Sequence, residues 1–123
     1  MYVFLVALGG AAGAVGRYLI GSWVLSRTGP EFPWSTFAIN VTGSLLIGIV
    51  LGFADGGRMG PEARSLLATG LLGGYTTFST FSYEGLLLLR GGDSGAFLLY
   101  LTEQVALGVS AAYLGTAIAK VLT

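Results

Sequence analysis

Cysteine and histidine are both absent from this chain of 123 residues. Disulfide bonds, thiol nucleophiles, imidazole bases and the zinc sites that these two residues build are therefore excluded. Charged residues are also scarce, at 10% against about 25% in a typical soluble domain. The six lysines and arginines are scattered singly along a chain of zero net charge, which leaves no basic patch for nucleic acid. No phosphate-binding loop or cluster of metal ligands is present either, so we expect no enzyme.

Apolar residues dominate what is present. They account for 54% of the chain, the mean hydropathy is +0.79, and 21 residues are glycine. Four apolar segments each reach the length of about 20 residues that a helix needs to cross a bilayer. The sequence therefore predicts an all-α integral membrane protein, a single domain of four transmembrane helices with both termini on one side. The predicted spans are residues 2–25, 35–54, 65–89 and 96–122.

Positive charge is balanced between the two faces of the predicted bundle. Lysine and arginine normally fix the orientation of a membrane protein by accumulating in its cytoplasmic loops. Without that bias, the sequence favours insertion in both orientations and an antiparallel homodimer. The alternative is that another factor, such as the N-terminal amine, fixes one topology. Arg58, Arg64 and Lys120 lie on the face of the termini, and Arg27 and Arg90 on the other, which Arg17 joins if its side chain extends to the nearer end of its helix.

Small residues recur at intervals of four in all the predicted helices, for example at Gly9 and Gly13 and at Gly48 and Gly52. This spacing lets helix backbones approach closely. We therefore expect tight packing between helices, and the pattern supports a dimer only modestly.

Residues 70–84, GLLGGYTTFSTFSYE, place glycines, hydroxyl residues and a carboxylate inside a predicted span. Lipid offers no hydrogen bonds, so such groups are tolerated there only where protein buries them or where they line an ion or water path. Gly73 and Gly74, followed by Tyr75, Thr76 and Thr77, combine low helix propensity with freed backbone, so we expect the third helix to break here, near mid-membrane. Carbonyls at the end of the first half-helix would favour a cation, and amides at the start of the second an anion.

Phe78 and Phe81 follow the predicted break and lie three residues apart, on one face of the second half-helix, with Ser79 and Thr80 between them. Aromatic rings have electropositive edges, which together with hydroxyl donors can solvate a small anion away from bulk water. Two phenylalanines alone would more simply be core or lipid-facing residues. The five serines and threonines in this short segment favour the anion path.

Polar side chains elsewhere in the predicted spans are further candidates. Asn40 carries an amide that can donate twice, either to an ion or in a plain hydrogen bond between helices. Glu84 is an intramembrane carboxylate and so a candidate functional residue; it is protonated, paired with Arg17, or a coupling residue. Tyr100 shares a face of the fourth helix with Gln104.

Three runs of sequence together resemble one known family. GAVGRYL at residues 13–19, FAINVTGSLLIG at 37–48 and GGYTTFSTFSYE at 73–84 closely resemble the Fluc/CrcB family of fluoride channels. The resemblance covers essentially the whole chain and implies a passive, fluoride-selective channel. It further implies an antiparallel homodimer with two pores. This dimer would lie in the inner membrane of a bacterium and lower the concentration of fluoride in the cytoplasm.

The resemblance also implies roles for individual residues. Phe78 and Phe81 would form an aromatic box lining the pore, and Asn40 would donate to the ion. The backbone carbonyls of Gly73 and Thr76, from both subunits, would hold a structural Na⁺ at the dimer centre, and no organic cofactor is implied. The remaining pathway residues would be Ser79, Thr80, Glu84 and Tyr100, with Arg17 near the vestibule. The chain departs from the family pattern beyond Tyr100, at Gln104 and Gly108.

Two other hypotheses stay open. A small proton-coupled multidrug exporter also has four helices and dual topology, but it needs an ionisable carboxylate in its substrate chamber, typically on the first helix. The first helix here has none, and only Glu84 and Glu103 could serve. A packing subunit without transport activity of its own is the third hypothesis.

Overall fold

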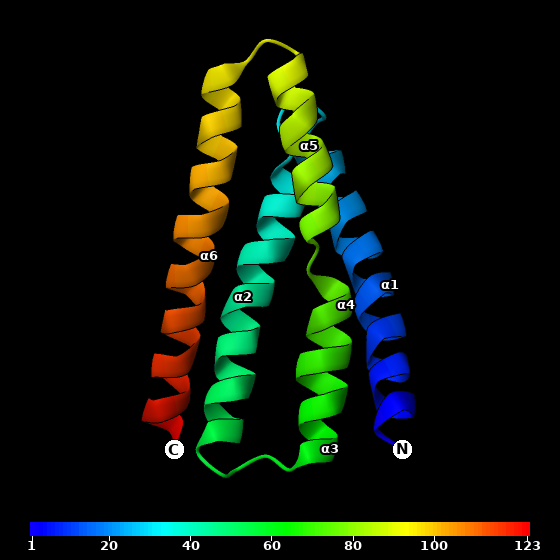
Figure 1. The fold of residues 1–123 in the computed structure, drawn as a ribbon, viewed down its shortest axis with the longest axis vertical. Helices are drawn as coiled ribbons and strands as arrows, with labels where there is room; N and C mark the ends of the chain where they lie inside the picture. Colours follow the sequence, from blue (N-terminus) through cyan, green and yellow to red (C-terminus); the bar gives the residue numbers. More distant parts are fainter.

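The computed structural model describes all 123 residues and contains helices but no β-strands, as the composition predicted. Three of its helices, α1, α2 and α6, are long and apolar enough to cross a bilayer. Both chain ends lie at the same end of the bundle (Figure 1). The elements are α1 (Tyr2–Thr28), α2 (Trp34–Asp55), α3 (Pro61–Arg64), the π-helix η1 (Ser65–Leu72), α4 (Gly73–Tyr75), α5 (Phe78–Arg90) and α6 (Ser94–Leu122).

The segment predicted as the third span is built from four consecutive elements, α3, η1, α4 and α5. It begins at Pro61, which occupies the first helical turn together with Glu62. Proline is suited to that position because its missing N–H would have no helical partner there. The π-helical geometry of η1 was not predicted, because its sequence, SLLATGLL, does not differ in character from that of an ordinary apolar helix. π-Helical turns are rare and are frequently found at functional sites.

The small-residue motifs are used for packing inside the chain. Helix α1 packs against η1 and α4, and α2 packs against α6. A Cβ atom built on Gly13 would lie 2.9 Å from the backbone nitrogen of Tyr75, and one built on Gly115 would lie 2.8 Å from that of Ile49. Such distances leave no room for a side chain. The glycines therefore set the close approach of α1 to α4 and of α2 to α6.

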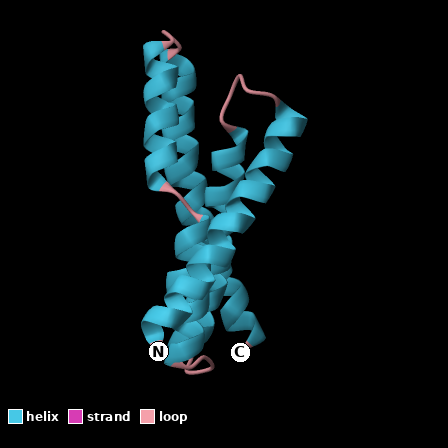
Figure 2. Cartoon of the chain, turned by 90° about the vertical axis from the view of Figure 1, so that its right-hand side faces the viewer, coloured by secondary structure: helices cyan, strands magenta, loops and turns pink.

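Helix α5 makes fewer contacts with the rest of the chain than the other long helices do. Figure 2 shows the bundle opening into a fork above its middle, with the loop that joins α1 to α2 on one branch. The three connections between the long segments each contain a glycine with positive φ: Gly29, Gly57 and Gly92.

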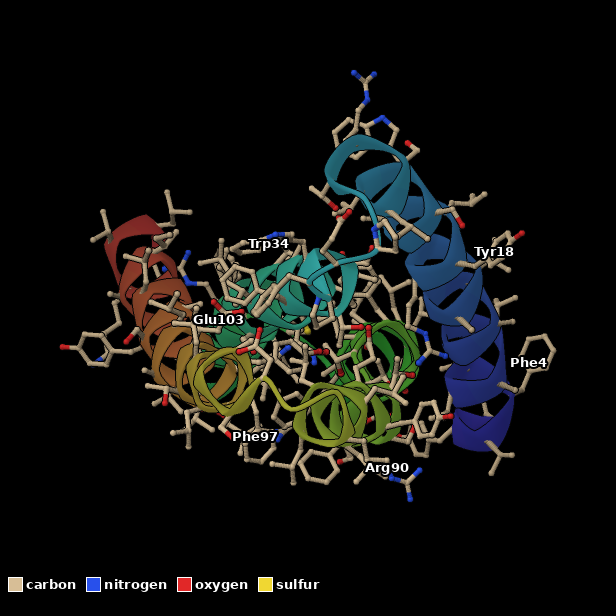
Figure 3. The ribbon with its side chains drawn as sticks, turned by 90° about the horizontal axis from the view of Figure 1, so that it is seen from above. Phe4, Tyr18, Trp34, Arg90, Phe97 and Glu103 are labelled. Atoms are coloured by element: carbon tan, nitrogen blue, oxygen red, sulfur yellow. The ribbon has the colours of Figure 1, made fainter.

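The outer surface of the chain is strongly apolar. Only 16 of 123 residues are buried, and large apolar side chains are exposed along every long helix. Phe4 and Tyr18 project from α1 away from the other helices (Figure 3). A surface of this kind needs an apolar environment, which lipid or a second chain provides.

Candidate functional site

The helical backbone is interrupted about half-way along the bundle, where Figure 2 shows a short loop. Helix α4 ends at Tyr75, Thr76 and Thr77 are extended, and α5 begins at Phe78. The sequence predicted a break within the run from Gly73 to Thr77; the structure keeps Gly73 and Gly74 helical and interrupts the helix at Thr76 and Thr77. Packing explains the presence of Gly74, because a Cβ atom there would lie 2.6 Å from the carbonyl oxygen of Gly10.

The side chain of Asn40 on α2 pairs with the interrupted backbone. Its Oδ1 atom accepts from the backbone N–H of Thr77 at 2.9 Å, and its Nδ2 atom donates to the carbonyl of Thr77 at 3.0 Å. Nδ2 also donates to Oε1 of Gln104 on α6, again at 3.0 Å. The Asn40 amide thus supplies the partners that a continuous helix would have supplied, which stabilises the extended residues.

The hydroxyl of Thr77 caps the start of α5. Its Oγ1 atom accepts from the backbone N–H of Thr80 at 3.2 Å, as threonine commonly does at a helix N-terminus. The hydroxyls of Ser79 and Thr80 lie 3.3 and 3.2 Å from the same Oγ1 atom. Three hydroxyl groups therefore gather at the point where the helix restarts.

A cavity of about 320 Å³ lies beside the interruption, between α2, α5 and α6. The rings of Phe78 and Phe81 on its wall are 5.7 Å apart between centroids and inclined at 64°. Phe81 also packs on Tyr100, with 5.2 Å between ring centroids. The lining residues are Asn40, Gly43, Ser44, Ile47, Thr76, Thr77, Phe78, Phe81, Gln104 and Val105.

Two buried hydrogen-bond donors on α6 have no partner. Tyr100 is completely buried, and its hydroxyl makes no hydrogen bond. Gln104, one turn further along, is 9% exposed, and its Nε2 atom is also unpaired. Unpaired buried polar groups are costly, and in a native structure they commonly indicate a missing ligand, ion or water.

A second cavity, of about 720 Å³, opens between α1, the loop after it, α2 and α5. Arg17, Thr80 and Glu84 line it. The hydroxyl of Thr36 donates to the Glu84 carboxylate, so the partner of Glu84 is Thr36 and not Arg17. Thr77, in the interruption, is the residue that lines both cavities.

The remaining candidates lie nearby. A Cβ atom on Gly108 would lie 3.6 Å from Oγ of Ser44, so a hydroxyl from α2 stands beside the place where α6 has no side chain. Ser44 itself donates to the carbonyl of Asn40 at 2.7 Å. On α6, one carboxylate oxygen of Glu103 is buried without a partner.

Sequence reasoning missed the roles of Thr36 and Thr77. Thr77 carried a usable signal, because threonine is a preferred residue immediately before the first turn of a helix. Thr36 carried none, since its partner Glu84 is 48 residues away in the sequence.

A family model described as CrcB-like protein, Camphor Resistance (CrcB), matches residues 4–116. The chain belongs to the CrcB family. The matched range contains every residue that lines the two cavities. The resemblance seen in the three sequence runs is thereby confirmed.

Several CrcB relatives carry the name fluoride-specific ion channel FluC. One from Thermus thermophilus is 51% identical over 111 residues, which cover 90% of this chain and 87% of the relative. One from Rhizobium meliloti is 46% identical over 123 residues and covers 98% of both chains. One from Acidobacterium capsulatum is 49% identical over 111 residues, covering 89% of both.

Proposed function

We propose that this chain is a passive fluoride channel of the bacterial inner membrane. The observation that carries the proposal is the cavity beside the interrupted helix, which Phe78, Phe81, Asn40 and Gln104 help to line. Bacterial relatives that share about half of its residues are named fluoride-specific ion channels. The activity is therefore that of a channel and not of an enzyme.

The chemistry of the 320 Å³ cavity suits fluoride. A buried anion is stable only where hydrogen-bond donors replace its water. The electropositive ring edges of Phe78 and Phe81 can approach it, and the hydroxyls of Ser79 and Thr80 extend the same turn of α5. Chloride is larger and would need a wider constriction, so we infer that width and donor density together select fluoride.

The larger cavity supports an aqueous entrance. Arg17 lines it, and a positive charge at the mouth of a low-dielectric passage raises the local concentration of anions. Because Thr77 lines both cavities, an ion moving from the entrance to the smaller cavity passes the interruption. Glu84 and Tyr100 would lie along this route, next to Thr36 and Phe81 respectively.

An antiparallel homodimer accounts for the exposed half of the site. Phe78 is 77% exposed in the single chain, and Gly73 is exposed as well. A second copy would cover both and complete an aromatic box. The interruption lies about half-way along the bundle, so two copies inserted in opposite orientations would bring their interruptions to the same depth, near mid-membrane (Figure 2). Each copy would then contribute to one of two pores.

The backbone near the interruption fits a structural Na⁺ held by the carbonyls of Gly73 and Thr76. In a continuous helix Gly73 would accept from the N–H of Thr77, and Thr76 from that of Thr80. Here the first N–H donates to Asn40 and the second to the Thr77 hydroxyl. Both carbonyls are thereby released from their helical donors, and carbonyl oxygens are good ligands for a hard cation. The Na⁺ would supply a fixed positive charge at the dimer centre.

Replacing Phe78 and Phe81 together with isoleucine tests the proposal. Contacts between two aromatic rings contribute about 0.5–1.5 kcal/mol; if each ring edge that faces the ion contributes a similar amount, losing two should slow fluoride release from proteoliposomes roughly tenfold. A fluoride electrode measures the release, and Phe4→Ile on the outer face of α1 is the matched control.

Unchanged release from the double variant would contradict the role of the ring edges. Failure of the unmodified protein to release fluoride, with proton-dependent export of lipophilic cations instead, would favour the exporter hypothesis.

A further inference from the structure

We infer that Tyr75 is a positioning residue, whose hydroxyl and ring fix the last turn before the interruption and with it the carbonyls of Gly73 and Thr76. This inference rests on the proposed structural Na⁺ and goes beyond it, because it assigns a side chain to the task of holding that site in shape. It is drawn from the hydrogen bond between Tyr75 on α4 and Thr42 on α2, and from the glycines that enclose the Tyr75 ring.

The direction of the hydrogen bond between Tyr75 and Thr42 follows from the other partners of Thr42. The Thr42 hydroxyl carries one hydrogen, and its Oγ1 atom lies 2.7 Å from the carbonyl oxygen of Ala38 and 3.1 Å from that of Ile39. A carbonyl oxygen can only accept, so this hydrogen is directed to the preceding turn of α2. The Tyr75 hydroxyl, 2.9 Å from Oγ1, is therefore the donor. Its acceptor is held in place by the backbone of a long helix.

The ring of Tyr75 is enclosed on two sides. Tyr75 is 8% exposed and forms a core cluster with Ile39 and Leu72. A Cβ atom built on Gly43 would lie 3.2 Å from Cδ2 of the ring, and one built on Gly16 would lie 4.0 Å from its Cδ1. The ring thus lies between α1 and α2, with one glycine beside each of its two edges. Within this space, the hydroxyl sets the position of the ring along α2.

Helix α2 thereby holds the interruption on both sides. After the break, Asn40 binds the N–H and the carbonyl of Thr77. Before the break, Thr42 binds the side chain of Tyr75. The carbonyl and the N–H of a trans peptide point in opposite directions, so the bond from the Thr77 N–H to Asn40 directs the Thr76 carbonyl away from Asn40.

The turn before the break depends on Tyr75 in a similar way. Helix α4 has only three residues, Gly73–Tyr75, and so short a helix is not stable by itself. Its other two residues are glycines, so Tyr75 is the only one that can hold the rotation of the turn through a side chain. The direction of the Gly73 carbonyl follows from that rotation. Loss of the Tyr75 contact should therefore weaken cation binding by these carbonyls.

Two variants remove the hydrogen bond and keep the packing. Tyr75→Phe removes the donor and keeps the ring, and Thr42→Val removes the acceptor and keeps the shape of the side chain. We would measure the melting temperature of the purified protein in detergent while NaCl replaces N-methyl-D-glucamine chloride at constant ionic strength. Bound Na⁺ stabilises the folded protein, so this titration gives the Na⁺ concentration of half-maximal effect. That midpoint should rise about three- to tenfold in both variants, which corresponds to the loss of one hydrogen bond of ordinary strength.

Tyr113→Phe is the matched control, because Tyr113 on α6 is 77% exposed. Its Na⁺ midpoint should equal that of the unmodified protein. The double variant of Tyr75→Phe and Thr42→Val should lie within about twofold of either single variant, because the two changes remove the same bond. Losses that multiply would show that the two hydroxyls act independently and would overturn the inference.

The Na⁺ midpoint separates positioning from stabilisation alone. A lower melting temperature of Tyr75→Phe with an unchanged midpoint would mean that Tyr75 only stabilises the fold, and this would overturn the inference. No effect of Na⁺ on the unmodified protein would remove the proposed sodium site and this inference with it. Fluoride release from the unmodified protein tests the channel separately, so failure of that function is recognised whatever the Na⁺ titration shows.

Discussion

Replacing Gly13 with alanine tests whether α1 fixes the position of the interrupted helix. A Cβ atom at this position would lie 2.9 Å from the backbone nitrogen of Tyr75 and 2.9 Å from the carbonyl carbon of Leu71. Non-bonded carbon atoms pack at about 3.5–4.0 Å, so α1 would have to move away by about half an ångström or more. Side-chain rotation cannot relieve the contact because its atoms belong to the backbone.

The expected cost follows from this overlap. Forcing an extra carbon into a packed interface costs about 1–3 kcal/mol, which corresponds to a melting temperature lower by roughly 5–15 °C. Tyr75 is the last residue of α4, so the displacement also reaches Thr76 and Thr77. Fluoride release should therefore fall together with stability.

Thermal unfolding of the purified protein in detergent measures the effect, and Gly16→Ala is the matched control. A Cβ atom on Gly16 would lie 4.0 Å from Cδ1 of Tyr75, which is an ordinary contact. Alanine also favours a helix over glycine by about 1 kcal/mol, so this control should be neutral or slightly more stable. Equal melting temperatures for the two variants would refute the reasoning about close backbone packing.

Thr77→Val removes the hydroxyl that caps α5 while keeping the shape of the side chain, and it should lower stability by about 0.5–2 kcal/mol in the same unfolding assay. Thr102→Val, at an exposed position, should change stability little. Arg17→Gln should slow fluoride release at about 0.1 M salt, and the difference should shrink at about 1 M salt because the screening length falls from about 10 Å to about 3 Å. Arg27→Gln, outside the cavity, is the control.

A different result would contradict each of these two predictions. Full stability of the Thr77 variant would mean that the hydroxyl does not hold the start of α5. A salt-independent effect of Arg17→Gln would argue against electrostatic attraction of the anion at the entrance.

The class of fold could be predicted from composition, because long apolar segments with few charges leave little choice but helices. Helix ends were harder to place. Helix α1 continues to Thr28, past the predicted residue 25, and stops only at Gly29, which has a φ of 80°. Hydropathy marks the apolar part of a helix, whereas the actual end depends on the backbone conformation that follows.

The position of the interruption shows the limit of helix propensity. Gly73 and Gly74 favour a break in isolation, but close packing against α1 holds Gly74 in the helix. The chain leaves the helix at Thr76 and Thr77, where Asn40 supplies substitute hydrogen bonds. That contact joins residues 37 positions apart, which no local pattern could reveal.

The residues of the candidate site were predicted from the sequence, but the hydrogen bonds between them were not. Phe78 and Phe81 could be placed on one face from their spacing alone. The hydrogen bond from Asn40 to Gln104 could not be predicted, because the two residues are 64 positions apart in the sequence. Knowing which hydrogens of Asn40 are already used required coordinates.

The most direct test of the central claim is fluoride and chloride release measured side by side from liposomes that contain the purified, unmodified protein. The account predicts rapid release of fluoride while chloride remains trapped, because the donors and ring edges beside the interruption, closed into a constriction by the second copy, would replace the water of the smaller ion only. Equal release of the two ions, or release of neither, would contradict it.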